Sequence, residues 1–233
     1  MYFKIEKLTT FIQQQLQALA DPAKAGPMAA YLKTDMPFYG VQKPDRVPIY
    51  KEMKKRFRPQ SQEDYECAVL ALWSLPHREE KYTAITFALQ NEAFITTKSL
   101  PLYEGLIREG AWWDLVDGVA SDLVGRVLLE HRSQTRAAIE KWVDDPDLWI
   151  RRTAIIAHLR HKEQTDAGQL FDHCLRRAHE KEFFIRKAIG WALREYSKTA
   201  PVEVREFLLK NREILSGLSF REGAKRLVKA GLM

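Results

Sequence analysis

Residues 109–117 read EGAWWDLVD, and the prediction of the fold starts from the helix boundary inside this stretch. Gly110 is expected to end one helix, and Asp114 falls in the first turn of the next, where a carboxylate faces the positive end of the helix dipole. If that second helix has begun by Trp113, then Trp113 and Asp117 are one turn apart and share a face. The stretch therefore predicts two consecutive helices, the second of which carries an aromatic ring beside a carboxylate.

Two interpretations of this face are open. An aromatic surface next to an anionic oxygen suits a cationic ligand, or a transition state that gains positive charge. The simpler interpretation is a pair of core tryptophans with two solvated acids. Adjacent helical residues cannot face the same way, so Trp112 is expected in the core whichever interpretation holds, and Asp114 is expected to act only at the helix start.

The rest of the chain continues the helical pattern. We expect about a dozen helices with short connections, since no stretch alternates apolar and polar residues over the length of a strand. The helix that begins at Trp113 is expected to run to His131, with a break near Gly125. Paired helices recur at roughly 35–40 residues, in the range of HEAT-type repeats. The sequence therefore predicts an all-α, HEAT-like helical-repeat solenoid in which residues 1–233 form a single domain, and the concave face of such an array is a natural binding surface.

Composition excludes several classes of protein. No apolar run approaches the ~18 residues of a membrane span, and the first residues lack the features of a signal peptide, so a cytoplasmic protein without membrane contact is expected. The distant Cys67 and Cys174 are expected to be reduced and packed as small apolar groups. His158 and His161 are three residues apart, but nothing nearby completes a set of ligands, so no metal site is expected.

Charge is distributed unevenly along the chain. The net charge of +6 comes from 37 basic and 31 acidic side chains. Residues 1–140 contain 18 of each, so the whole excess lies in residues 141–233, with 19 basic and 13 acidic side chains. Such a bias favours a polyanionic partner, although many helical proteins are as basic without one.

Two further segments place an aromatic residue one helical turn from a charge. Trp149 precedes Arg152 by three residues, and Lys187 precedes Trp191 by four. Trp149 itself, like Trp73 and Trp142, is expected to pack inside the protein. If the helices stack in register, one strip would contain the residues Trp113, Asp117, Arg152, Lys187 and Trp191.

These segments resemble a known family. AWWDLVD at 111–117 looks like the WWDxVD motif of the AlkD-type DNA alkylation-repair glycosylases, and LWIRRTAI at 148–155 is similar to the arginine-bearing helix of that family. KEFFIRKAIGWALREY at 181–196 resembles a further block of the family, as do PMAAYLK at 27–33 and FYGVQ at 38–42. The resemblance spans nearly the whole chain, and the WWDxVD and KAIGW blocks are specific when they occur together.

The resemblance implies roles for individual residues. Asp117 would be the catalytic carboxylate, while Trp113 and Trp191 would hold the sugar of the damaged nucleotide. Arg152 would bind the DNA backbone near the lesion. Further DNA contacts would come from the residues Tyr31, Gln42, Arg151 and Lys187. Of these, Arg151 stands where the family would have a neutral polar residue, and it either adds a phosphate contact or is simply exposed.

The resemblance implies a HEAT-like solenoid with a concave, basic DNA-binding face that hydrolyses the N-glycosidic bond of N3- and N7-alkylated purines in duplex DNA and needs no cofactor. The sequence implies no protein partner, and a monomer is expected because a solenoid can act on DNA alone. Two other functions are left open by the residues. One is a helical-repeat protein that binds DNA without chemistry, although mere binding has no use for an acid beside phosphates. The other is a protein-interaction scaffold in which the basic bias is incidental.

Overall fold

The computed structural model describes residues 4–233, and this part of the chain is helical without a strand. The prediction of an all-α helical-repeat fold is confirmed. The chain divides into two compact units, one that ends at Ile95 and one that spans Thr96–Met233. None of the helices in the described range is long and apolar enough to cross a membrane.

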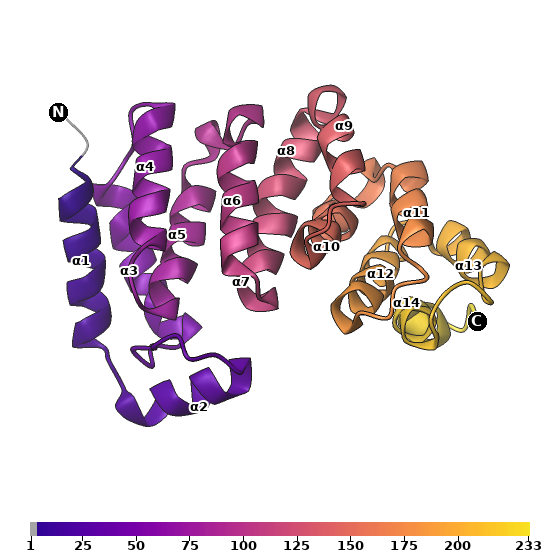
Figure 1. The fold of residues 1–233 in the computed structure, drawn as a ribbon, viewed down its shortest axis with the longest axis horizontal. Helices are drawn as coiled ribbons and strands as arrows, with labels where there is room; N and C mark the ends of the chain where they lie inside the picture. Colours follow the sequence, from indigo (N-terminus) through magenta and orange to yellow (C-terminus); the bar gives the residue numbers. More distant parts are fainter. Residues whose placement is uncertain (1–3) are drawn as a thin grey trace. The chain divides into compact units, whose positions relative to one another are not determined.

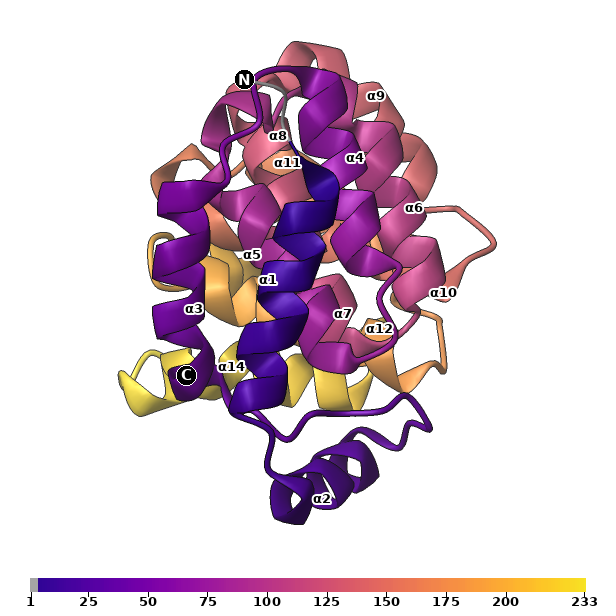
Figure 2. The same cartoon turned by 90° about the vertical axis from the view of Figure 1, so that its left-hand side faces the viewer.

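The first unit is built from five helices of residues 4–95. They are α1 (Ile5–Ala18), α2 (Pro22–Leu32), α3 (Lys43–Arg56), α4 (Gln62–Trp73) and α5 (Arg78–Gln90), followed by the 3₁₀ turn η1 (Glu92–Phe94). Helices α1, α3, α4 and α5 pack together around large buried side chains such as Tyr65, Trp73 and Phe87. Helix α2 lies across one end of this group (Figures 1 and 2).

The second unit carries the predicted site. Its helices are α6 (Leu100–Gly110), α7 (Trp113–Gly118), α8 (Gly125–Glu130), α9 (Arg132–Trp142), α10 (Leu148–Ile156), α11 (Ala167–Arg176), α12 (Phe183–Tyr196), α13 (Pro201–Lys210) and α14 (Gly217–Lys229). Short segments join them: η2 (Thr97–Ser99), η3 (Val119–Val124), η4 (Ala157–Arg160) and η5 (Lys162–Gln164). Helix α10 contacts both α7 and α12, so it lies between the helices that carry the two predicted tryptophans.

The boundary inside residues 109–117 falls where the sequence predicts it. Helix α6 ends at Gly110, but the left-handed residue that follows is Ala111, with φ +35°. Trp112 is extended, and α7 begins at Trp113. Trp113 and Asp117 are therefore one turn apart in the same helix.

The predicted break near Gly125 is wrong. Helix α7 continues through the π-helical segment η3 into α8, so residues 113–130 form one helical run. Gly125 serves packing instead, because a Cβ at this position would lie 2.4 Å from the carbonyl oxygen of Ala157. The wider π-turn begins directly after the turn that carries Asp117, and π-turns inside helices are frequent at functional sites.

The predictions for internal packing are mostly confirmed. Trp73, Trp142 and Trp149 are buried, and so is Cys174, where burial raises the pKa of the thiol. Cys67 corrects the expectation, because it is exposed on α4 rather than packed. Both cysteines are free.

Candidate functional site

The centre of the candidate site is an ion pair between α7 and α10. Nε of Arg152 donates to one oxygen of Asp117 and Nη2 donates to the other, both at 2.8 Å. The two residues are 35 positions apart in the sequence. A bidentate pair of this kind fixes the plane of the carboxylate as well as its position.

Arg152 also joins the pair to α12. Its Nη1 donates to the carbonyl oxygen of Phe184 at 2.6 Å, and its guanidinium carbon lies 5.9 Å from the centre of the Phe184 ring. Only 4% of Arg152 is exposed. One buried guanidinium therefore ties the helix of the predicted catalytic acid to the helix of Trp191.

An aromatic cluster packs beside this arginine. The ring centres of Trp112 and Trp149 are 5.9 Å apart, and the Phe184 ring lies 5.5 Å from Trp112 and 4.9 Å from Trp149. Trp112 packs against these rings but is half-buried, and it is the extended residue before α7, so the prediction that it lies in the core is corrected. Its indole N–H is buried without a hydrogen-bond partner in the described part of the chain. The cluster gives Arg152 a rigid apolar surround, which strengthens its hydrogen bonds to Asp117.

The two tryptophans predicted to hold the sugar are both half-buried. Trp113 begins α7, one turn before Asp117. Trp191 lies on α12, seven residues after Phe184, so both residues fall on the same side of that helix, about 10 Å apart along its axis. Helices α7, α10 and α12 thus supply the acid, the arginine and the second tryptophan, respectively.

Arg151, the neighbour of Arg152, is committed to other contacts. Its Nε and Nη2 both donate to the carboxylate of Glu180 at 3.0 Å, and its Nη1 donates to the carbonyl oxygens of Asp145 and Pro146 at 2.8 Å. These bonds attach the start of α10 to the loop before α12. Arg151 is therefore not simply exposed, and its contact with DNA stays a prediction.

Lys187 lies on α12 and forms an ion pair with Glu222 of α14 at 3.3 Å, while 37% of its side chain remains exposed. Glu222 is buried, and its pKa falls to about 2 because it accepts hydrogen bonds from Lys225, Lys187 and Arg194 despite its partial desolvation. The contact of Lys187 with DNA also stays a prediction.

Tyr31 and Gln42 belong to the first unit. Tyr31 is 75% exposed on α2, and the exposed Gln42 is the residue before α3. The loop that leads to Gln42 is held by Glu79, which is fully buried and accepts hydrogen bonds from the backbone N–H groups of Tyr39, Gly40 and Val41 at 2.9–3.1 Å. Both predicted DNA contacts are therefore accessible.

No set of metal ligands surrounds the ion pair in the described residues. One group elsewhere, Glu140, Asp172 and His173, has oxygen and nitrogen atoms close enough to hold an ion. The guanidinium of Arg176 already donates to Glu140 and Asp172, at 3.0 Å and 3.3 Å. A cation therefore occupies that position already.

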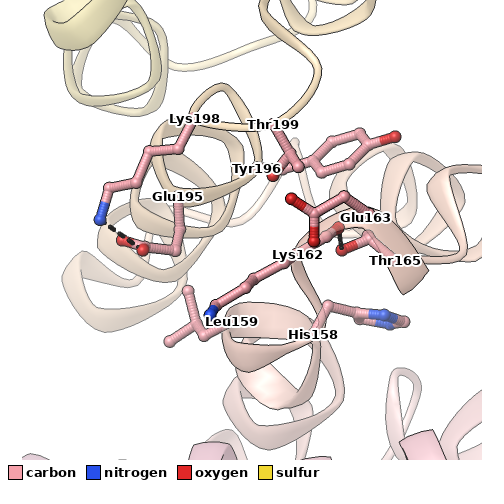
Figure 3. Close-up of a pocket in the computed structure, with 9 residues that line it drawn as sticks. All are labelled: His158, Leu159, Lys162, Glu163, Thr165, Glu195, Tyr196, Lys198 and Thr199. Atoms are coloured by element: carbon pink, nitrogen blue, oxygen red, sulfur yellow. Dashed lines mark hydrogen bonds and ion pairs between the residues drawn. The ribbon is translucent and has the colours of Figure 1, made fainter.

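A pocket of the second unit lies between the segment after α10 and the end of α12 (Figure 3). Its lining includes His158, Lys162, Glu195 and Lys198, and none of the predicted site residues. The charges in it are balanced, since Lys198 forms an ion pair with Glu195. The pocket therefore shares no residue with the candidate site.

Comparison with known proteins identifies a family. A family model described as DNA alkylation repair enzyme matches residues 12–227. The chain belongs to this family. No curated protein matches the sequence.

A solved structure supports the same family. It is described as a predicted DNA alkylation repair enzyme from Enterococcus faecalis, is 32% identical to this chain and has a TM-score of 0.83. The match covers 90% of this chain and 97% of that one. Membership of the family makes DNA the partner of this protein.

Sequence reasoning missed three residues that organise the site. Phe184 provides the carbonyl oxygen for Arg152, Glu180 holds Arg151, and Glu222 gathers three cations. Phe184 lies in the block at 181–196 that resembles the family, and Glu180 lies directly before it. Their position in the sequence could therefore have marked both as candidates for the site. Glu222 stands in a separate helix, and no local pattern marks it.

Proposed function

We propose that the protein is a DNA glycosylase that hydrolyses the N-glycosidic bond of cationic N3- and N7-alkylated purines in duplex DNA, as a monomer without a cofactor. The family supports an enzyme of alkylation repair. The observation that carries the finer proposal is the bidentate Arg152–Asp117 pair in the WWDLVD helix. It holds one carboxylate in a fixed orientation.

The chemistry of the substrate limits what the protein must supply. An N3- or N7-alkylpurine already carries a positive charge, so the bond between C1′ and N9 can break with its electron pair moving onto the base, which leaves neutral. No general acid is needed. A water oxygen then forms the new bond to C1′ and loses a proton. What remains to be stabilised is the oxocarbenium character of the sugar.

Asp117 suits that role by its hydrogen-bond capacity. A carboxylate has about four acceptor sites, and Arg152 uses one on each oxygen. The remaining sites are available to the sugar or to the attacking water. Arg152 thus orients the carboxylate while leaving half of its acceptor capacity for the reaction.

Trp113 and Trp191 would add attraction for the cationic sugar and base. An aromatic face contributes about 0.5–2 kcal/mol to binding of a cation. Both side chains are half-buried, so each is braced by the protein yet retains accessible surface. We assign them to gripping the nucleotide rather than to reading the edge of the base.

The DNA contacts follow from the donors that are left. Within residues 4–233, Arg152 uses three of its five N–H groups and Arg151 forms four hydrogen bonds, so two N–H groups of Arg152 and one of Arg151 are left. A phosphate would reach Arg152 through the 4% of that residue that is exposed. Lys187, Gln42 and Tyr31 complete the set of proposed contacts. Of these contacts, Arg151, Arg152 and Lys187 would belong to the basic DNA-binding face expected from the charge of residues 141–233.

The test is release of a base. Purified protein is incubated with a duplex that contains one N7-methylguanine, and free 7-methylguanine and an alkali-labile abasic site are measured. Both should appear in equal amounts. Salt-sensitive DNA binding without release would instead identify a non-catalytic DNA-binding protein, and the absence of both would favour a protein-interaction scaffold.

A further inference from the structure

The surface shared by α12 and α14 contains a cluster of unbalanced positive charge. Glu222 of α14 forms ion pairs with Lys187 and Arg194 of α12 and with Lys225 of its own helix. Three cations thus share one carboxylate. No other carboxylate of residues 4–233 lies within ion-pair distance of these three, so the cluster carries a net charge of about +2.

The cations of the cluster remain accessible although the acid does not. Only 10% of the Glu222 side chain is exposed, against 37% for Lys187, 31% for Arg194 and 59% for Lys225. The carboxylate therefore anchors the three side chains from below. Their outer N–H groups stay free to meet a second anion.

Helix geometry places the cluster beside Trp191. Lys187 precedes Trp191 by four residues and Arg194 follows it by three, so the three side chains form one stripe along α12. The helices approach closely at this point, because a Cβ on Gly190 would lie 2.4 Å from Cβ of Glu222. The hydroxyl of Ser219 adds a hydrogen bond of 3.0 Å to the carbonyl oxygen of Arg186. The cluster is thus built on two tightly packed helices.

We propose that Lys187, Arg194 and Lys225 form a binding site for a backbone phosphate of DNA, organised by Glu222, next to the nucleotide held by Trp191. This inference rests on the proposed action on duplex DNA. A phosphodiester accepts several hydrogen bonds, so it can accept bonds from all three side chains, and its one negative charge offsets about half of their net positive charge. Lys187 and Arg194 flank Trp191 along α12, so the phosphate would lie next to that tryptophan.

The experiment measures binding of an undamaged, fluorescently labelled duplex over a range of KCl concentrations. A triple variant, Lys187→Gln, Arg194→Gln and Lys225→Gln, removes the site. Its matched control removes three cations of the same unit that form ion pairs with acids outside the cluster: Arg126→Gln, Arg160→Gln and Lys198→Gln. Thermal unfolding by circular dichroism verifies that both variants are folded.

Each phosphate contact contributes about 0.9 to the slope of log K against log salt concentration. Because the site binds one phosphate, the site variant should lose a slope of about 0.9 and bind on the order of tenfold more weakly at low salt, while the control keeps a slope close to that of the parent. Equal losses in both variants would overturn the proposal, since they would reflect net charge alone, and so would an unchanged slope in the site variant.

The outcome is separable from that of the proposed function. Binding to an undamaged duplex involves no chemistry, so a selective loss of slope supports the phosphate site even if the protein releases no base. Base release with an unchanged slope would remove the phosphate site and leave the glycosylase in place.

Discussion

At the residue scale, the site depends on which of two adjacent arginines meets the acid. The sequence provides Arg151 and Arg152 without distinguishing their partners. In the folded chain Arg152 binds Asp117 and Arg151 binds Glu180. The resemblance assigns a role to Asp117 and a separate role to Arg152, but it does not predict an ion pair between them. Local spacing cannot predict the pair either, because 35 residues separate the two. Only the packing of α7 against α10 brings them together.

Arg152→Lys tests this pairing. Lysine retains the charge but cannot donate two parallel hydrogen bonds, so Asp117 loses its fixed orientation. Excision of 7-methylguanine under single-turnover conditions should fall on the order of tenfold or more. Arg108→Lys is the matched control, because Arg108 forms a bidentate pair with Asp145 in the same unit. An equal loss in both variants would count against a specific role for Arg152.

At the scale of the elements, one helix boundary lies where residues 109–117 predict it, since α6 ends at Gly110 and α7 begins at Trp113. Polar caps fix other helix starts, for example Asp147, whose side chain accepts a hydrogen bond from the N–H of Trp149 at 2.7 Å at the start of α10. The π-helical segment η3 could not be predicted, because its residues do not differ in type from those of an ordinary α-helical turn. The role of Gly125 was misjudged for a related reason: glycine marks a close approach there rather than a break.

Gly190→Ala tests how much the close contact between α12 and α14 contributes to the stability of the protein. The added Cβ would lie 2.4 Å from Cβ of Glu222 and 3.0 Å from the carbonyl oxygen of Ser219, so the helices must separate. We expect a loss of about 1–3 kcal/mol in the free energy of unfolding. Urea unfolding measures it.

The control for this substitution is Gly105→Ala in α6. Nothing lies within 4 Å of its added Cβ, so the change should stabilise the helix by about 0.5–1 kcal/mol. Opposite signs for the two substitutions are therefore expected. A stabilising effect of Gly190→Ala would show that α14 can move away from α12 at little cost, and that the close contact does not contribute to stability.

At the scale of the whole molecule, composition and helical periodicity were enough to predict the all-α repeat fold. The concave basic face, the single domain over residues 1–233 and the monomeric state stay predictions. They depend on how many helices come together in space, and local periodicity carries no information about that. The same holds for the buried histidines, which the sequence presented only as a pair without further ligands.

These histidines predict how stability depends on pH. Burial lowers the pKa of His158 well below its usual value, with His161 and His173 adding repulsion, and burial also lowers the pKa of His161. The unfolded chain therefore binds more protons below its own histidine pKa of about 6.5. Stability is fully present above that pH and is lost as pH falls through the lower pKa values of the folded state.

Urea unfolding between pH 8 and pH 5.5 measures this effect. The free energy of unfolding should fall by up to about 1.4 kcal/mol per pH unit for each histidine. In His158→Leu the dependence of stability on pH should be shallower, because one titrating group with a lowered pKa is removed. The substitution breaks no hydrogen bond of the ring, since neither ring nitrogen of His158 has a partner among the described residues. An identical pH profile in parent and variant would exclude His158 as a source of the effect.

The central claim is that Asp117 performs glycosidic hydrolysis while other groups bind the DNA. The most direct measurement is excision of 7-methylguanine and affinity for the same duplex, determined in parallel for the parent, Asp117→Asn and Asp122→Asn. Asp122→Asn is the control, because it replaces a carboxylate by an amide in the same helical run. Asp122 forms an ion pair with the exposed Arg160. We predict that Asp117→Asn loses at least about a hundredfold in rate, with nearly unchanged affinity, and that Asp122→Asn keeps both. Full excision by Asp117→Asn would contradict the account.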